Sequence, residues 1–185
     1  MRFALLPLSL MLLLACDDAV APRQATALTA ARFPGAAPQG VATGALVYVP
    51  VYSSVFGHEG QTVHDLTVML SARNTDEAAP IVITSARYLD AAGQELHRYA
   101  EGPVVVGPLG SAEALVAESD TRAGMGGTFL VEWRADAEVS EPIIEAVMVG
   151  TGHQQGISFV SEGRVVRRFT ASAPTPGQQP AEDLR

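Results

Sequence analysis

The chain has 185 residues and a formal net charge of −8, and its composition excludes several classes of protein. The negative charge disfavours nucleic-acid binding, because no overall basic field attracts phosphates. All 12 basic residues are arginines, which excludes a catalytic lysine Schiff base and a Walker A phosphate loop. The only cysteine is Cys16, so the chain has no intrachain disulfide and no cysteine-based zinc site.

The first 15 residues have the features of a secretory signal. Arg2 supplies a short positive region, and residues 3–14 form an apolar run that is shorter than the roughly 20 residues of a transmembrane helix. The run ends in Leu-Leu-Ala-Cys16, which resembles a bacterial lipobox, although an ordinary signal with an incidental cysteine is the alternative. Two or three acyl chains on Cys16 would anchor the protein stably. We therefore predict a lipoprotein of the bacterial cell envelope, on the periplasmic face of the inner or outer membrane.

The mature chain is predicted to consist of a tether, one domain and a tail. Residues 16–44 follow the signal peptide, 1–15, and are rich in Ala, Pro, Gln, Thr and Gly, which is typical of a disordered tether. Residues 171–185 contain three prolines and are predicted to form a disordered tail. The remaining residues, 45–170, are numerous enough to bury one hydrophobic core.

Short strands separated by turns are predicted throughout residues 45–170, and no segment shows helical periodicity. The clearest is 66–73, in which apolar residues occupy every second position. With 95–106 counted as one bent strand, the pattern predicts an all-β fold, an immunoglobulin-like antiparallel sandwich of about seven or eight strands. A closed barrel is the alternative. The predicted strands are 46–52, 66–73, 81–88, 95–99, 104–106, 112–117, 128–134, 143–149 and 157–160.

Several strings of the chain resemble a known bacterial family. Among them are Val47-Tyr-Val-Pro-Val-Tyr-Ser-Ser54, Gly107-Pro-Leu-Gly-Ser-Ala-Glu113 and Gly150-Thr-Gly-His-Gln-Gln-Gly-Ile-Ser-Phe-Val-Ser161. The family is domain of unknown function three-one-two-four, and the resemblance covers nearly all of residues 47–166. Its members are largely exported proteins or lipoproteins, so the resemblance implies a single exported domain. It implies no activity.

One end of the predicted sandwich collects most of the residues capable of chemistry. Successive antiparallel strands reverse direction, so the connections 53–65, 89–94, 118–127 and 150–156 are predicted to share an end. Loops at one end of a rigid sandwich are where such folds usually bind ligands. We therefore predict a binding site for an unidentified protein or small molecule at this end. Its candidate residues are His58, His64, Glu118, Asp120, Arg122, His153 and Gln154.

Two alternatives use the same end. Three histidines and a carboxylate could bind zinc, although no two of these histidines have the close spacing of ligands on one element. Ser53 or Ser119, together with His153 and Asp120, could act in hydrolysis, but the chain has no Gly-x-Ser-x-Gly elbow. We therefore predict a non-catalytic binding module without a cofactor, and a metal-binding or hydrolytic protein around His153 is the alternative.

Overall fold

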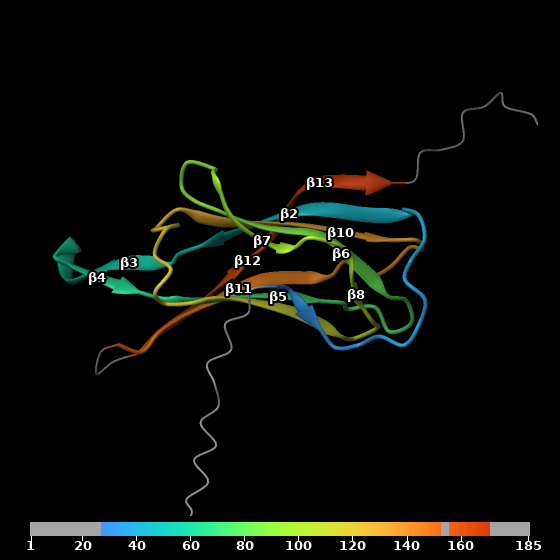
Figure 1. The fold of residues 1–185 in the computed structure, drawn as a ribbon, viewed down its shortest axis with the longest axis horizontal. Helices are drawn as coiled ribbons and strands as arrows, with labels where there is room; N and C mark the ends of the chain where they lie inside the picture. The colour runs from blue at the N-terminus through green and yellow to red at the C-terminus, as the bar shows by residue number, and fades with distance from the viewer. Residues whose placement is uncertain (1–26, 153–155, 171–185) are drawn as a thin grey trace, which may run out of the picture.

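The fold is an antiparallel β-sandwich, seen in a computed structural model that describes residues 27–152 and 156–170 (Figure 1). Two antiparallel sheets pack face to face, and the only helix in these residues is one short 3-10 turn. The predicted all-β sandwich is therefore confirmed. The signal peptide, Cys16, His153, Gln154 and the tail 171–185 lie outside the described residues.

We call the two sheets A and B. Sheet A has the strand order β1-β9-β5-β11-β12, and sheet B has the order β13-β2-β10-β6-β7, with β8 also paired to β6. The strands of sheet A are β1 Thr29–Ala30, β5 Thr67–Arg73, β9 Ser111–Val116, β11 Ile143–Gly150 and β12 Ile157–Glu162. Those of sheet B are β2 Thr43–Val51, β6 Ile81–Leu89, β7 Glu95–Ala100, β8 Val104–Val106, β10 Gly127–Ala135 and β13 Arg164–Thr170. A separate hairpin consists of β3 Ser54–Gly57, the 3-10 turn His58–Gly60 and β4 Thr62–Asp65.

Some of the strand pairings correspond to those of an immunoglobulin domain. The pairs β5–β9 and β6–β10 take the places of the B–E and C–F pairs. The positions of β2 and β11 differ from those of the first and last strands of an immunoglobulin domain. Here β2 pairs with β10 in sheet B, and β11 pairs with β5 in sheet A. These two strands have exchanged sheets relative to the immunoglobulin arrangement.

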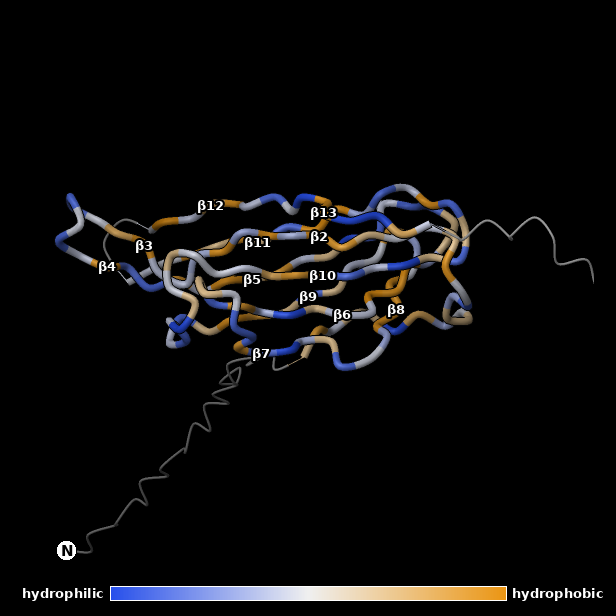
Figure 2. Tube along the Cα trace, turned by 90° about the horizontal axis from the view of Figure 1, so that it is seen from above, coloured by the Kyte–Doolittle hydropathy of each residue, from blue (hydrophilic) through white to orange (hydrophobic). Residues whose placement is uncertain are grey.

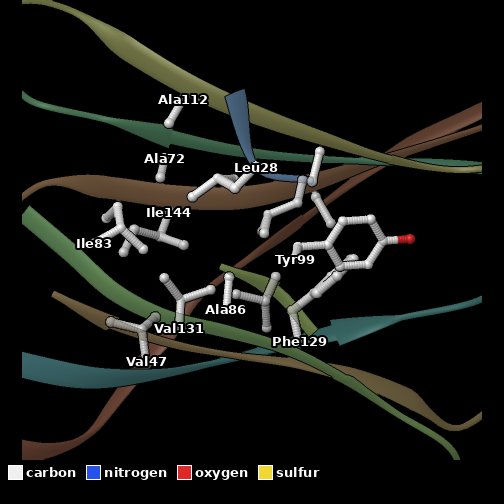
Figure 3. Packing of buried hydrophobic residues seen from close by; sticks show 14 of the residues in the cluster. Leu28, Val47, Ala72, Ile83, Ala86, Tyr99, Ala112, Phe129, Val131 and Ile144 are labelled. Carbon is white, nitrogen blue, oxygen red and sulfur yellow. The ribbon is translucent and has the colours of Figure 1, made fainter. Parts of the chain in front are cut away.

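The core lies between the two sheets and follows the period-two alternation of the strands. Leu66, Val68, Leu70 and Ala72 are fully buried, as the pattern of β5 predicts. From sheet B, Phe129 and the other inward residues of β10 face them, and Figure 3 shows residues of both sheets meeting in this layer. Burial of this apolar layer is what holds the two sheets together.

One edge of the sandwich is closed by a strand that crosses between the sheets. β12 pairs with β11 in sheet A, and β13 follows after the single residue Gly163 and pairs with β2 in sheet B. The two strands follow each other along this edge in Figure 2. The N–H of Gly163 donates to the carbonyl of Ile144, 2.8 Å away. The predicted strand 157–160 is therefore longer, and the pairing of 164–170 was not predicted.

The opposite edge is closed by the start of the described chain. The Leu28 N–H donates to the carbonyl oxygen of Tyr99 in β7 at 2.6 Å, and Thr29 pairs with Glu113 of β9. The Leu28 side chain is 6% exposed and belongs to the core. Residues 28–30 thus connect sheet B to sheet A. Within the predicted tether 16–44, this segment packs against the sandwich.

Candidate functional site

The strand register places four connections at one end of the sandwich. Val51 pairs with Gly127, and Leu89 pairs with Thr128 in the same sheet. In sheet A, β5, β9 and β11 reach the same end of the sandwich. Their pairing brings residues 67–68, 116 and 149 together there. The bent strand predicted at 95–106 is also observed, because β7 and β8 both run antiparallel to β6. We call this end, with its connections 52–66, 90–94, 117–126 and 151–156, the loop end.

The first of these connections is a hairpin that projects from the sandwich (Figure 1). Sequence reasoning treated residues 53–65 as a loop, but β3 and β4 pair from Ser54 to Asp65. Phe56 and Val63 form a cross-strand pair, and they are 65% and 55% exposed. His58 lies in the 3-10 turn at the tip with a φ of 41°. The hairpin thus presents an apolar pair to solvent beside polar residues.

A small cavity lies at the base of this hairpin and brings two of the predicted residues together. Its volume is about 170 Å³, below the roughly 300 Å³ at which pockets for drug-sized ligands begin. The ring of His64 packs over Gly57, where a Cβ atom would collide with it, and the Thr62 hydroxyl oxygen lies 3.5 Å from His64 Nε2. The cavity has room for a single side chain. It is lined by Val63, His64, Asp65, Glu118, Gly150, Gly152 and Ile157.

Asp120 and Arg122 form a bidentate ion pair in the connection between β9 and β10. Arg122 Nε donates to one carboxylate oxygen of Asp120 at 2.8 Å, and Nη2 donates to the other at 2.7 Å. These hydrogen bonds lower the pKa of Asp120, although partial burial opposes the shift. Arg122 is held in the same way, and its pKa is raised by the carboxylate. The two charges therefore satisfy each other within the loop.

Three residues of the neighbouring strands belong to the same region and were not predicted. Tyr88 is fully buried, and burial raises its pKa to about 12. Burial likewise raises the pKa of Tyr99 to about 12, and its hydroxyl donates to the Leu115 carbonyl at 3.1 Å. The ring of His97 contacts Tyr99 edge-on, with centroids 4.4 Å apart. His97 could have been predicted from the sequence, because it lies near the start of a strand that follows directly after a connection of the loop end.

The described residues do not by themselves assemble a metal site. No group of three or more His, Cys, Asp or Glu side chains among them is close enough to hold a metal ion. His58 lies at the hairpin tip, whereas His64 lines the cavity at its base. His153 and Gln154 lie outside the described residues, so the metal and hydrolytic alternatives both depend on a residue whose position is not described.

Residues 44–166 match the family described as "Protein of unknown function (DUF3124)". The chain belongs to this family. The DUF3124 match covers the sandwich from β2 into β13, including the loop end, and begins after β1. No curated protein and no solved structure matches the chain. Across the described residues, no helix is long and apolar enough to cross a membrane.

Proposed function

We propose that this DUF3124 protein is a lipid-anchored, non-catalytic binding module of the bacterial envelope, and that its loop end binds a protein partner. The anchor is proposed from the string Leu-Leu-Ala-Cys16 at the end of a short apolar run. A protein partner is favoured over a small molecule because the cavity of about 170 Å³ is too small to enclose a drug-sized ligand.

The observation that carries the proposal is the exposed pair of Phe56 and Val63 on the projecting hairpin. An exposed aromatic side chain beside a pocket is typical of the few residues that dominate binding energy at protein interfaces. Val63 belongs to both features, since it also lines the cavity with His64 and Glu118. A partner can therefore cover Phe56 with apolar side chains and insert one polar side chain toward Glu118.

The position of the anchor supports a partner that is also part of the envelope. Leu28 is fixed at the edge between β7 and β9, and it lies 12 positions after Cys16. Even a fully extended chain of that length reaches only about 40 Å, at about 3.3–3.6 Å for each residue. A lipid on Cys16 would therefore keep the sandwich close to the membrane surface.

The binding proposal is tested by photo-crosslinking of the full-length chain in cells. A photoreactive phenylalanine replaces Phe56, and in a matched control it replaces Leu109, which is 69% exposed in the connection between β8 and β9 at the opposite end. We expect a discrete adduct from position 56 and none from position 109. Glu118→Gln should weaken the adduct, because it removes the charge from the cavity. Adducts of equal yield from both positions, or none from position 56, contradict the proposal.

The anchor is tested separately by cell fractionation. Cys16→Ala removes the only thiol of the chain, and with it the site of lipidation. We expect the variant to leave the membrane fraction, whereas the unmodified chain stays in it under high salt. A variant that remains membrane-bound to the same extent shows that the anchor is something else.

A further inference from the structure

The outer face of sheet B carries a row of residues that crosses all five strands of its main path. Arg164 of β13 pairs with Tyr48 of β2, and Tyr48 pairs with Leu130 of β10. Leu130 pairs with Arg87 of β6, which in turn pairs with Arg98 of β7. Neighbouring strands lie about 4.8 Å apart, so the row extends over roughly 19 Å. Cations from distant parts of the chain therefore share one face of the sheet.

This surface is positively charged although the whole chain is negative. We call it the arginine face. Arg98 pairs with Glu95 at 2.8 Å and Arg134 pairs with Glu132 at 2.8 Å. Arg164 and Arg167 are exposed, and neither has an ion-pair partner in the described part of the chain. The outer face of these strands carries five arginines and two glutamates, namely Arg87, Arg98, Arg134, Arg164, Arg167, Glu95 and Glu132. The sixth arginine of these strands, Arg168, pairs with Glu141 instead.

The outer face of sheet A has the opposite charge. Glu113 and Glu145 both pair with Ser71, and Glu162 pairs with Glu145, so three carboxylates share one row. The nearest cation in this sheet is Arg73, whose Nη2 lies 3.7 Å from Glu145. The sandwich is therefore polarised across its thickness, positive on the sheet B side and negative on the sheet A side. A charged surface would orient it accordingly.

Aromatic side chains accompany the cations on the arginine face. The Phe169 ring lies between two guanidinium groups, 5.3 Å from that of Arg134 and 5.1 Å from that of Arg167. Tyr48 is 39% exposed, and its hydroxyl oxygen accepts a hydrogen bond from Thr128 at 2.8 Å. The Tyr48 ring, with an apolar body and a polar tip, suits the boundary between lipid headgroups and water. The arginine face thus combines positive charge with aromatic surface.

We propose that the arginine face docks on the anionic lipid headgroups of the membrane that carries the anchor. The described chain begins at the edge between the two sheets, where the Leu28 N–H is bonded to Tyr99 of β7 and Thr29 pairs with Glu113 of β9, so an anchor before this point leaves either face free to turn toward the membrane. Charges farther away than the Debye length of about 8 Å are largely screened, so the near face outweighs the net charge of −8. Several cations on one face can each attract a lipid phosphate. The proposal rests on the proposed membrane anchor. The attraction between the arginine face and the headgroups is weak by itself, and the anchor keeps the two close together.

The approach of the sandwich to the membrane can be measured with the only tryptophan of the chain. Trp133 is buried on the inner side of β10, the middle strand of sheet B, so its indole lies between the two sheets, and its distance from the headgroups decreases when the sandwich docks. The mature chain, Cys16–Arg185, is coupled through its only thiol to a maleimide lipid in vesicles. Energy transfer from Trp133 to dansyl-labelled headgroups is then compared on phosphatidylcholine alone and on phosphatidylcholine mixed with phosphatidylglycerol.

We expect greater energy transfer on the vesicles that contain phosphatidylglycerol, and a decrease when salt is added. Arg164→Gln and Arg167→Gln should each lower the ratio of docked to undocked molecules about fivefold, and about 25-fold together. Arg73→Gln is the matched control, because it removes the same charge from the opposite face. Circular dichroism checks that each variant is folded, which is expected because these side chains are exposed.

Equal transfer on the two kinds of vesicle overturns the proposal. So does a loss in Arg73→Gln as large as that in Arg167→Gln, because the effect would then reflect net charge and not a face. Chemical coupling makes the measurement independent of natural lipidation. An unmodified Cys16 in the protein purified from cells would therefore refute the proposed anchor without changing the outcome for the arginine face.

Discussion

Gly163 is the point at which a single methyl group should weaken the whole sandwich. A Cβ atom there would lie 2.4 Å from the carbonyl oxygen of Ile144 and 2.6 Å from Cγ1 of Val47. The first of these atoms is backbone and belongs to the hydrogen bond of 2.8 Å from the Gly163 N–H. Alanine therefore cannot be accommodated by a side-chain rotation alone. The chain has to move away from β11 at the place where it crosses between the sheets.

The cost follows from three contributions. Overpacking typically costs about 1–3 kcal/mol, and weakening one hydrogen bond adds about 1 kcal/mol. Alanine also lowers the conformational entropy of the unfolded chain, which stabilises the fold by about 0.4–1 kcal/mol and offsets part of this cost. We expect Gly163→Ala to lower the free energy of unfolding by about 2–3 kcal/mol, and the melting temperature by roughly 5–10 °C for a domain of this size.

The matched control is Gly102→Ala in the connection between β7 and β8, where no atom lies within 4 Å of the added Cβ. It makes the same change to the unfolded chain and should leave stability within about 1 kcal/mol. The assay is urea and thermal unfolding of the mature chain, followed by circular dichroism and Trp133 fluorescence. If the two variants unfold alike, the crossing at Gly163 is not as tightly packed as the structure indicates.

Three further predictions concern the edges and loops of the sandwich. A segment of residues 27–170 should unfold cooperatively with a β-type spectrum, and removing β1 to leave 45–170 should lower its melting temperature, because a buried leucine and the link between the sheets are lost. Asn74→Asp should destabilise by about 2–4 kcal/mol in urea titrations, since the buried amide nitrogen donates to three backbone carbonyls and a carboxylate cannot. Arg122 lowers the pKa of Asp120, so their pair stabilises the fold at neutral pH, and this contribution disappears as the pH falls through the lowered pKa. Arg122→Gln should therefore cost at most about 1 kcal/mol near pH 7, and the cost should shrink as the carboxylate becomes protonated at low pH, measured as melting temperature against pH.

The sequence alone determined the class of fold and the grouping of the connections. Alternating apolar residues in 66–73 predicted which side chains are buried, because adjacent residues of a strand point to opposite faces. The loop end followed from counting reversals, since the end at which a connection lies depends only on how many strands precede it. Burial and strand direction are both local properties, so one sequence was enough for them.

The edges and the hairpin were decided by the tertiary structure. β1 has only two residues, and β13 is mostly exposed, so neither carries the alternation by which a half-buried strand is recognised. These strands exist because β9 and β2 offer unpaired backbone groups to them. Sequence reasoning likewise took 53–65 for a loop, because its strands β3 and β4 pair only with each other and stay exposed.

The arginine face is the clearest example of a feature that the tertiary structure decides and the sequence does not. Its cations come from four strands between Arg87 and Arg167, and nothing in the spacing of these residues along the chain groups them. The formal charge of −8 gives the sum of the charges and does not show how they are distributed over the surface. Only the register of β13, β2, β10, β6 and β7 brings the side chains to one side of one sheet. Charge is a property of composition, but a charged face depends on which strands are neighbours, and long-range pairing decides that.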